Sequence, residues 1–224
     1  MINSTHGLGD ECEKRLGENI RSENSIFMKI NALFDILPLA IIIDDRIMCC
    51  HGGIGSSINK VSEIAAIKRP IQIVQDVRTN EQQILIDLIW SEYSDEINDV
   101  AVNDERDTMK LGFITKYGKE RVNKFLADNK LSLLITSHQL IQEGIKTFNN
   151  EKVVVIYSAT NYMDRFNNIA GMINITKKPS MILPKLIDMI KLDKKNYRPS
   201  KNISPVRWKG TNNNNNVLNN KKDT

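Results

Sequence analysis

Three short runs of aliphatic residues, each followed directly by polar residues, constrain the fold of this 224-residue chain most strongly. They are residues 46–50 before His51, residues 131–136 before Ser137 and His138, and residues 153–157 before a polar loop with Asn161 and Tyr162. Short aliphatic runs bounded by turn residues are typical of buried strands. Open α/β sheets place ligand sites at the carboxyl ends of their strands. We therefore expect these polar side chains to lie at the ends of neighbouring strands.

The rest of the pattern mixes strands with helices. Asp44-Asp45 joins residues 39–43 to residues 46–50 as a predicted hairpin. Helical spacing predicts helices over residues 10–16, 22–37, 60–67, 81–89, 119–128 and 139–148, and further strands over 172–176 and 181–186. One face of the second helix carries Ile26, Ile30, Leu33, Phe34 and Leu37, and the fifth helix turns Val122, Phe125 and Leu126 inward. Such a mixture indicates a layered α/β or α+β domain.

The basic charge of the chain is concentrated in its last part. The net charge is +4, but residues 177–224 alone hold 12 basic and 3 acidic residues. This part is polar, contains five consecutive asparagines and shows no periodicity, so we expect residues 193–224 to be a disordered, basic, Asn-rich tail, with 197–224 dispensable for the fold. Residues 1–192 are then one domain. Charge confined to a tail gives no general case for nucleic-acid binding.

Cysteine usage and hydropathy predict a location inside the cell. The chain has three cysteines, and two of them are adjacent, which does not suit a disulfide framework. The longest apolar run, residues 36–43, is far too short to span a membrane, and charged residues at 10–15 do not fit a signal peptide. We expect an intracellular protein, cytoplasmic or nuclear or both.

Two of the three histidines, His51 and His138, follow predicted strands. A neutral imidazole at a rigid strand end is a good ligand for a divalent metal, and Gly52-Gly53 would let an ion approach the backbone. The alternative is structural, because a histidine at a strand end more often makes hydrogen bonds within the fold. A zinc site from Cys49, Cys50 and His51 is not expected, because consecutive residues of a strand cannot all face one ion.

Several short motifs occur in order between residues 3 and 190. They are Cys49-Cys50-His51-Gly52-Gly53-Ile54, Trp90-Ser91, Ser137-His138-Gln139, Glu143-Gly144 and Ser158-Ala159-Thr160-Asn161-Tyr162. In this order they resemble the C-terminal half of the PPP-family metal-dependent Ser/Thr protein phosphatases. The stretch HGGIGSSIN at residues 51–59 is most similar to the Kelch-repeat branch of that family.

The resemblance implies a fold and an activity. The fold is α/β, a layered β-sandwich flanked by helices, known as the calcineurin-like metallophosphatase fold. The implied activity is hydrolysis of phosphoserine and phosphothreonine esters at a centre of two divalent metal ions, with manganese expected and iron or zinc as alternatives. His51 and His138 match ligands of one of these ions, and Tyr162 matches the tyrosine that lines the substrate pocket.

The chain also departs from the family pattern. The motifs GDxHG, GDxxDRG and GNHE, which carry further metal ligands and the general-acid histidine, do not occur in it. The resemblance therefore implies an N-terminally truncated domain with no catalytic acid of its own, which we expect to be inactive alone. The phosphate-binding arginine of the family falls at Lys110 or Leu111, or at Arg106 if the alignment is shifted, and Lys110 is our predicted phosphate-binding residue.

These observations leave two main hypotheses of function open. The chain carries the second half of a protein phosphatase site, as a fragment or an incomplete gene model, or it is a catalytically inactive phosphatase-like binding module. RNA or membrane-surface binding through the tail rests on charge alone. The expected partners are phosphoprotein substrates, regulatory subunits or the missing N-terminal half, with no nucleic acid and no membrane.

Overall fold

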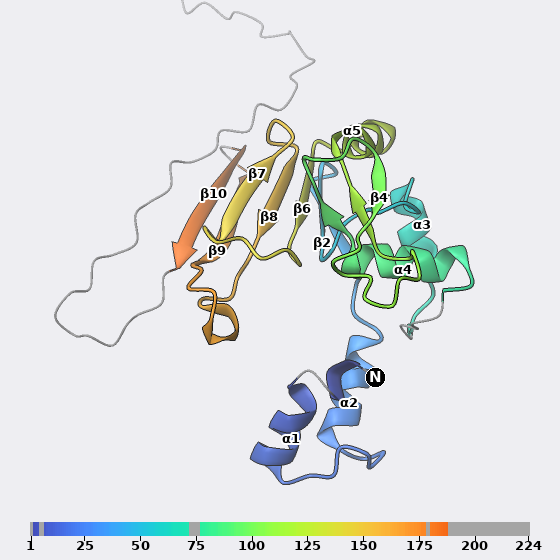
Figure 1. Cartoon of the computed structure of the whole chain (residues 1–224), viewed down its shortest axis with the longest axis vertical. Coiled ribbons are helices and arrows are strands. Elements are labelled where there is room, and N and C mark those ends of the chain that lie inside the picture. The colour runs from blue at the N-terminus through green and yellow to red at the C-terminus, as the bar shows by residue number, and fades with distance from the viewer. Residues whose placement is uncertain (1, 5–6, 72–76, 178–179, 188–224) are drawn as a thin grey trace, which may run out of the picture. The chain divides into compact units, whose positions relative to one another are not determined.

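The computed structural model describes residues 2–4, 7–71, 77–177 and 180–187 (Figure 1). The chain divides into two compact units, Met1–Gln139 with Thr147–Val154, and Leu140–Lys146 with Val155–Thr224. The predicted tail, residues 193–224, lies outside the described residues. Within the described ranges, none of the helices has the length and apolar character needed to cross a membrane.

A five-stranded sheet with the order β1-β2-β6-β8-β7 organises the first unit, to which Thr147–Val154 contribute parts of the last two strands. The strands are β1 (Ala40–Ile43), β2 (Ile47–Cys50), β6 (Leu133–Thr136), β7 (Ile145–Phe148) and β8 (Val153–Ile156). The predicted hairpin is confirmed, because β1 and β2 pair antiparallel across Asp44 and Asp45, both at positive φ. Strand β2 pairs with β6 in parallel, so these two predicted strands end at the same edge.

The core of this sheet is aliphatic. All four residues of β6 are buried, and Leu133, Leu134 and Val153 are fully inaccessible to solvent. A strand that is buried along its whole length reads as a continuous apolar run rather than as an alternating pattern. This explains why Leu133, Leu134 and Ile135 are apolar without alternation.

Helices of the first unit occur where they were predicted, although α2 is shorter than the predicted range of 22–37. They are α1 (Leu8–Leu16), α2 (Ile26–Phe34), α3 (Val61–Ala66), α4 (Asn80–Trp90) and α5 (Lys119–Asp128). Helix α5 has the predicted bounds, and Val122 and Phe125 are fully buried as expected. Helix α4 begins with a capping box, in which Thr79 accepts a hydrogen bond from the backbone of Gln82 and the Gln82 side chain accepts one from the backbone of Thr79.

The apolar face of α2 lies in solvent, although it has the spacing of a packing face. The exposed residues include Ile26, Leu33 and Phe34, followed by Leu37 after the helix, each at least 45% accessible. Phe27 and Asn31 are buried instead. The helix still has a regular start, because Ser25 accepts a hydrogen bond from the backbone N–H of Met28.

A second, three-stranded sheet in the first unit was not predicted. It has the order β3-β5-β4, with strands β3 (Glu92–Tyr93), β4 (Val100–Val102) and β5 (Thr115–Tyr117). Strands of two or three residues are too short to show a period of two. Its first strand, β3, begins at Glu92, directly after the Trp90-Ser91 motif at the end of α4.

The second unit contains an antiparallel hairpin of β9 (Ala170–Lys177) and β10 (Ser180–Ile187), in agreement with the two predicted strands. The predicted helix over 139–148 is wrong, because residues 145–148 form strand β7. Gly144 has a φ of +74°, and a Cβ there would lie 2.6 Å from the backbone of Ala170. A left-handed residue in such a tight place ends any helix, although the aliphatic spacing around it suits one.

Candidate metal centre

The imidazoles of His51 and His138 meet at one edge of the sheet. Each follows one strand of the parallel pair β2 and β6, and the Ser137 N–H donates to the His51 carbonyl at 2.8 Å, which continues that ladder past the strand ends. His51 Nε2 and His138 Nδ1 are 3.2 Å apart, although 87 residues separate them in the sequence. The predicted convergence of these side chains is confirmed.

The two glycines after His51 are required by close packing. The Gly52 N–H donates to the Leu88 carbonyl at 2.6 Å, and a Cβ on Gly52 would lie 2.8 Å from the backbone of Ile89 in helix α4. A Cβ on Gly53 would overlap the ring of Tyr117, whose hydroxyl donates to the Gly52 carbonyl at 3.2 Å. The end of α4 and the Tyr117 ring therefore fix the path of the chain beside His51.

Two buried charged residues hold the next part of this loop, and sequence reasoning did not identify them. The Asp87 carboxylate accepts hydrogen bonds from the Ser57 N–H at 2.8 Å and from its hydroxyl at 2.7 Å. The Arg121 guanidinium donates to the carbonyls of Gly55 and Ile58. Burial raises the pKa of Asp87, and the hydrogen bonds from Ser57 and its other partners oppose that shift. These residues position the loop rather than face a ligand.

His138 is held in place from the opposite side. It adopts a φ of 41°, and the edge of its ring packs against Trp90 with the ring centres 5.3 Å apart. The next residue, Gln139, exchanges two hydrogen bonds with the backbone of Tyr93 in β3, at 3.1 and 2.9 Å. The SHQ motif therefore fixes one imidazole between α4 and β3.

A buried carboxylate lies beside the histidine pair. Glu92 Oε1 is 3.8 Å from His138 Nε2 and accepts a hydrogen bond from Arg106 Nε at 2.9 Å. Arg106 Nη2 forms an ion pair with the same oxygen at 2.8 Å. Glu92 Oε2 accepts a further hydrogen bond from Asn103 Nδ2 at 2.9 Å. The arginine that this network brings to the site is Arg106.

Lys110, the predicted phosphate-binding residue, lies in an exposed turn. Its backbone N–H donates to the Asp107 carbonyl at 2.9 Å, and it has a φ of 53°. Its role stays a prediction. The sequence pointed to Arg106 only if the alignment with the family was shifted. The loop before β5 has no regular spacing that would fix this alignment.

The surroundings of both histidines lower their pKa values and so favour the neutral imidazole. Burial, reinforced by the positive charge of Arg106 and by His51, lowers the pKa of His138 to about 4, and the charge of Glu92 opposes this shift. Burial also lowers the pKa of His51. His138 Nε2 is buried without a hydrogen-bond partner among the described residues. Neutral imidazole is the form that binds metals.

The spacing of the two nitrogens fits two neighbouring ligand positions on one ion. Nitrogens that each lie about 2.1 Å from an ion are about 3.0 Å apart at a right angle and about 3.4 Å apart at the tetrahedral angle. The observed separation of 3.2 Å falls between these values. Within the described part of the chain, no group of three or more His, Cys, Asp or Glu side chains could hold a metal. The described part of the chain therefore presents two ligands, His51 and His138.

Tyr162, the predicted pocket tyrosine, belongs to the second unit. It begins a short 3₁₀ turn, η2 (Tyr162–Asp164), and its backbone N–H donates to the Asn168 side chain at 2.8 Å. Its ring is 43% exposed and stands edge-on to Tyr157 at 5.4 Å between ring centres. The accessible ring suits contact with a ligand, and that role stays a prediction.

Comparison with known proteins gives three consistent findings. The family model for calcineurin-like phosphoesterases matches residues 6–142. The chain is 36% identical over 186 residues to the serine/threonine-protein phosphatase BSL2 of Arabidopsis thaliana, covering 83% of this chain and 17% of that protein.

A solved protein serine/threonine phosphatase from Saccharomyces cerevisiae, described as similar to human phosphatase PP5, has the same fold. It matches with a TM-score of 0.68 and 22% identity, over 85% of this chain and 57% of that one. The chain thus spans less than two thirds of the length of either relative.

Proposed function

The chain belongs to the calcineurin-like phosphoesterase family, and from this premise we propose that it forms part of a metal-dependent serine/threonine protein phosphatase. The 36% identity to BSL2 supports a place among the PPP-family phosphatases, on the Kelch-repeat branch. The proposed substrates are phosphoserine and phosphothreonine esters of proteins. In that reaction water attacks phosphorus, the ester P–O bond breaks, and the protein alcohol leaves with a proton.

The observation that carries this proposal is the pair of neutral imidazoles with nitrogens 3.2 Å apart. Divalent ions, when bound, would polarise the phosphoryl group and lower the pKa of the attacking water. The family binds such ions, and we propose manganese, with iron and zinc as alternatives. His51 and His138 would hold one ion, and a planar guanidinium such as that of Arg106, fixed on Glu92, can bind two phosphate oxygens at once.

We propose that residues 1–192 contribute two ligands to this centre and no general acid. The family motifs that supply the other ligands and the acid are absent from the sequence, and the described residues hold no third ligand near the pair. The chain purified alone is then inactive, because a general acid alone contributes about 10²–10⁴-fold to such a rate. Regulatory subunits or the N-terminal half are its proposed partners, and its free thiols suit a cytoplasmic or nuclear location.

A second candidate function is a non-catalytic module that binds phosphoproteins or other partners. The same observation favours it, because the nearby Glu92 carboxylate is engaged by Arg106 and Asn103. Two imidazoles without a free carboxylate hold a hard divalent ion weakly. The two candidates differ in what happens when the missing motifs are supplied. A latent half-site gains activity, and a binding module does not.

The test has two parts. Calorimetric titration of the 224-residue chain with Mn²⁺ should show weak binding that falls at least tenfold in His138→Ala, while His6→Ala, which removes the third histidine, leaves it unchanged. Fusing the chain to a relative's segment with GDxHG, GDxxDRG and GNHE should produce turnover of a phosphoserine peptide that His138→Ala abolishes. Turnover by the chain alone would contradict the half-site proposal, and no turnover by a folded fusion would favour the binding module.

A further inference from the structure

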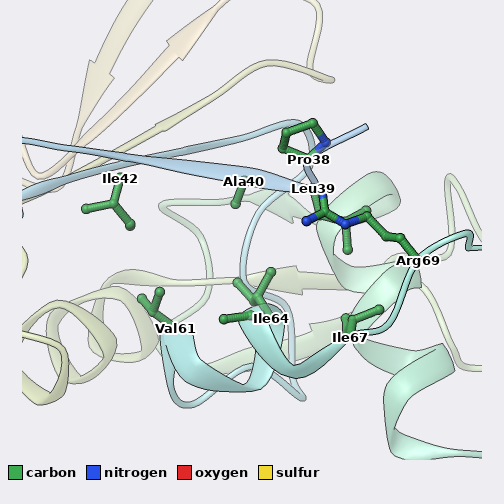
Figure 2. A pocket seen from close by; sticks show the side chains of 9 residues that line it. Pro38, Leu39, Ala40, Ile42, Val61, Ile64, Ile67 and Arg69 are labelled. Atoms are coloured by element: carbon green, nitrogen blue, oxygen red, sulfur yellow. The ribbon is translucent and has the colours of Figure 1, made fainter. Parts of the chain in front are cut away.

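An apolar groove lies between strand β1 and helix α3 in the first unit (Figure 2). Its volume is about 230 Å³. Ala40 and Ile42 of β1 form one wall, and Val61 and Ile64 of α3 face them. Ala65 of α3 also lines the groove. Alternate residues of β1 thus share the groove, as the period of two in a strand requires.

Strand β1 is an outer strand of the five-stranded sheet. It pairs with β2 along one side, so the N–H and C=O groups of alternate residues point away from the sheet on the other side. In the sheets that the structure describes, β1 has no second neighbour. Ile41, in the middle of this edge, is 58% exposed. An open, aliphatic edge strand is a ready partner for another extended segment.

We propose that this groove binds an extended peptide segment of another protein, which adds a strand to β1 and places a carboxylate beside Arg69. In strand addition the main-chain hydrogen bonds supply affinity, and pockets for alternate side chains supply specificity. Here the open edge of β1 would supply the main-chain hydrogen bonds, and the groove would supply the pocket for alternate side chains. The proposal goes beyond phosphate ester hydrolysis and involves none of the residues of the histidine pair.

The size of the groove favours peptide side chains over a cofactor. Pockets for drug-sized ligands have volumes of about 300–1,000 Å³, and this groove is smaller, at about 230 Å³. It has room for one or two aliphatic side chains. Its walls carry no carboxylate, and every lining side chain other than that of Arg69 is apolar, so the aliphatic part of the bound segment would meet mainly apolar surface there.

The charge at one end of the groove selects an acidic residue. Arg69 lies at this end (Figure 2) and is the charged residue of the lining. Its Nη1 donates to the Ile36 carbonyl at 3.3 Å, which orients the guanidinium, and no carboxylate among the described residues forms an ion pair with it. A guanidinium held in this way matches the two oxygens of a carboxylate.

Selection from a phage library of random twelve-residue peptides on the full 224-residue chain tests this proposal. Enriched peptides should carry aliphatic residues at alternate positions with Asp or Glu near one end. Fluorescence anisotropy with a labelled enriched peptide should show binding at least about tenfold weaker to Arg69→Glu and to Ala65→Leu. Lys68→Glu and Ala66→Leu make the same changes on exposed neighbours outside the groove and should bind as the unmodified chain does.

Thermal unfolding of each variant shows whether it is folded. If Arg69→Glu does not fold, Ala65→Leu still tests the proposal, because Ala65 is at an exposed position of the helix. Enriched peptides without this pattern, or equal binding to groove and control variants, would overturn the proposal. Sedimentation of the chain alone checks for a second copy as the occupant. A dimer that Ala65→Leu dissociates and Ala66→Leu does not would also overturn it.

Discussion

At the scale of single residues, Glu92 shows how a buried charge is accommodated beside the histidine pair. Its side chain is 9% exposed, and a carboxylate in such a place is costly unless it is paired. Arg106 supplies a hydrogen bond and an ion pair, and Asn103 supplies a second hydrogen bond. The arginine therefore contributes to stability as well as to the charge of the site.

Replacement of this arginine should test that contribution. In Arg106→Ala the Glu92 carboxylate keeps only Asn103 as a hydrogen-bond donor, and we expect unfolding in urea to require about 1–3 kcal/mol less free energy. Arg15→Ala is the control, because Arg15 pairs with Glu11 on the exposed surface of α1, where such pairs contribute about 0.3–0.5 kcal/mol. Equal effects of the two changes would contradict this account.

The glycine beside the Tyr117 ring gives a second residue-scale prediction. Gly53→Ala introduces a Cβ that overlaps the fully buried ring, and overpacking of this kind costs about 1–3 kcal/mol. Denaturant titration should show this loss. Ser56→Ala, at an exposed position of the same loop, should change stability by less than about 0.5 kcal/mol. A stability for Gly53→Ala as high as that of Ser56→Ala would show that the ring moves aside without cost.

At the scale of secondary-structure elements, the sequence predicted the helices and strands that have regular spacing or a clear turn. Helix α5 was predicted because its helical spacing extends over ten residues, and the hairpin of β1 and β2 was predicted because Asp44-Asp45 marks its turn. Strand β7 was predicted as helix, because its aliphatic spacing is ambiguous and the constraint at Gly144 comes from a distant backbone. The histidine pair followed from motifs, whereas the contacts of Asp87 and Arg121 with the loop depend on packing between segments 30 or more residues apart.

Helix α4 connects this element scale to the site, because its last turn packs on the loop after His51. Thr79→Ala removes the side-chain acceptor at the start of α4, and we expect a loss of about 0.5–2 kcal/mol in the free energy of unfolding. Thr108→Ala, at an exposed position outside the helices, should leave it within about 0.5 kcal/mol. No difference between the two would mean that the capping box contributes nothing measurable.

At the scale of the whole molecule, the exposed apolar face of α2 should influence behaviour in solution. Ile26, Leu33 and Phe34 lie together on a helix yet remain largely accessible. Contiguous apolar surface on a soluble protein is typical of an interaction site or a cause of association. This face is therefore expected to promote self-association of the chain in solution.

Charge placed on this face should reduce association. Leu33→Glu should lower the fluorescence of a bound apolar dye and shift sedimentation toward the monomer. Ala32→Glu adds the same charge at a neighbouring exposed position of α2 and should have little effect on either measurement, because it removes no large apolar side chain. A similar response to both substitutions would mean that net charge, rather than the apolar face, controls association.

The parallel pairing of β2 and β6 has a thermodynamic consequence for ligand linkage. It brings together two histidines that lie 87 residues apart in the sequence, so folding has already met the entropy cost of closing that loop before any ion binds. An ion that bridges both imidazoles finds them paired only in the native chain, and so it binds the unfolded chain less well. Such a ligand at a hundred times its Kd stabilises the native state by about 2.7 kcal/mol. The midpoint of thermal unfolding should therefore rise with Mn²⁺ concentration, and His138→Ala should abolish that rise.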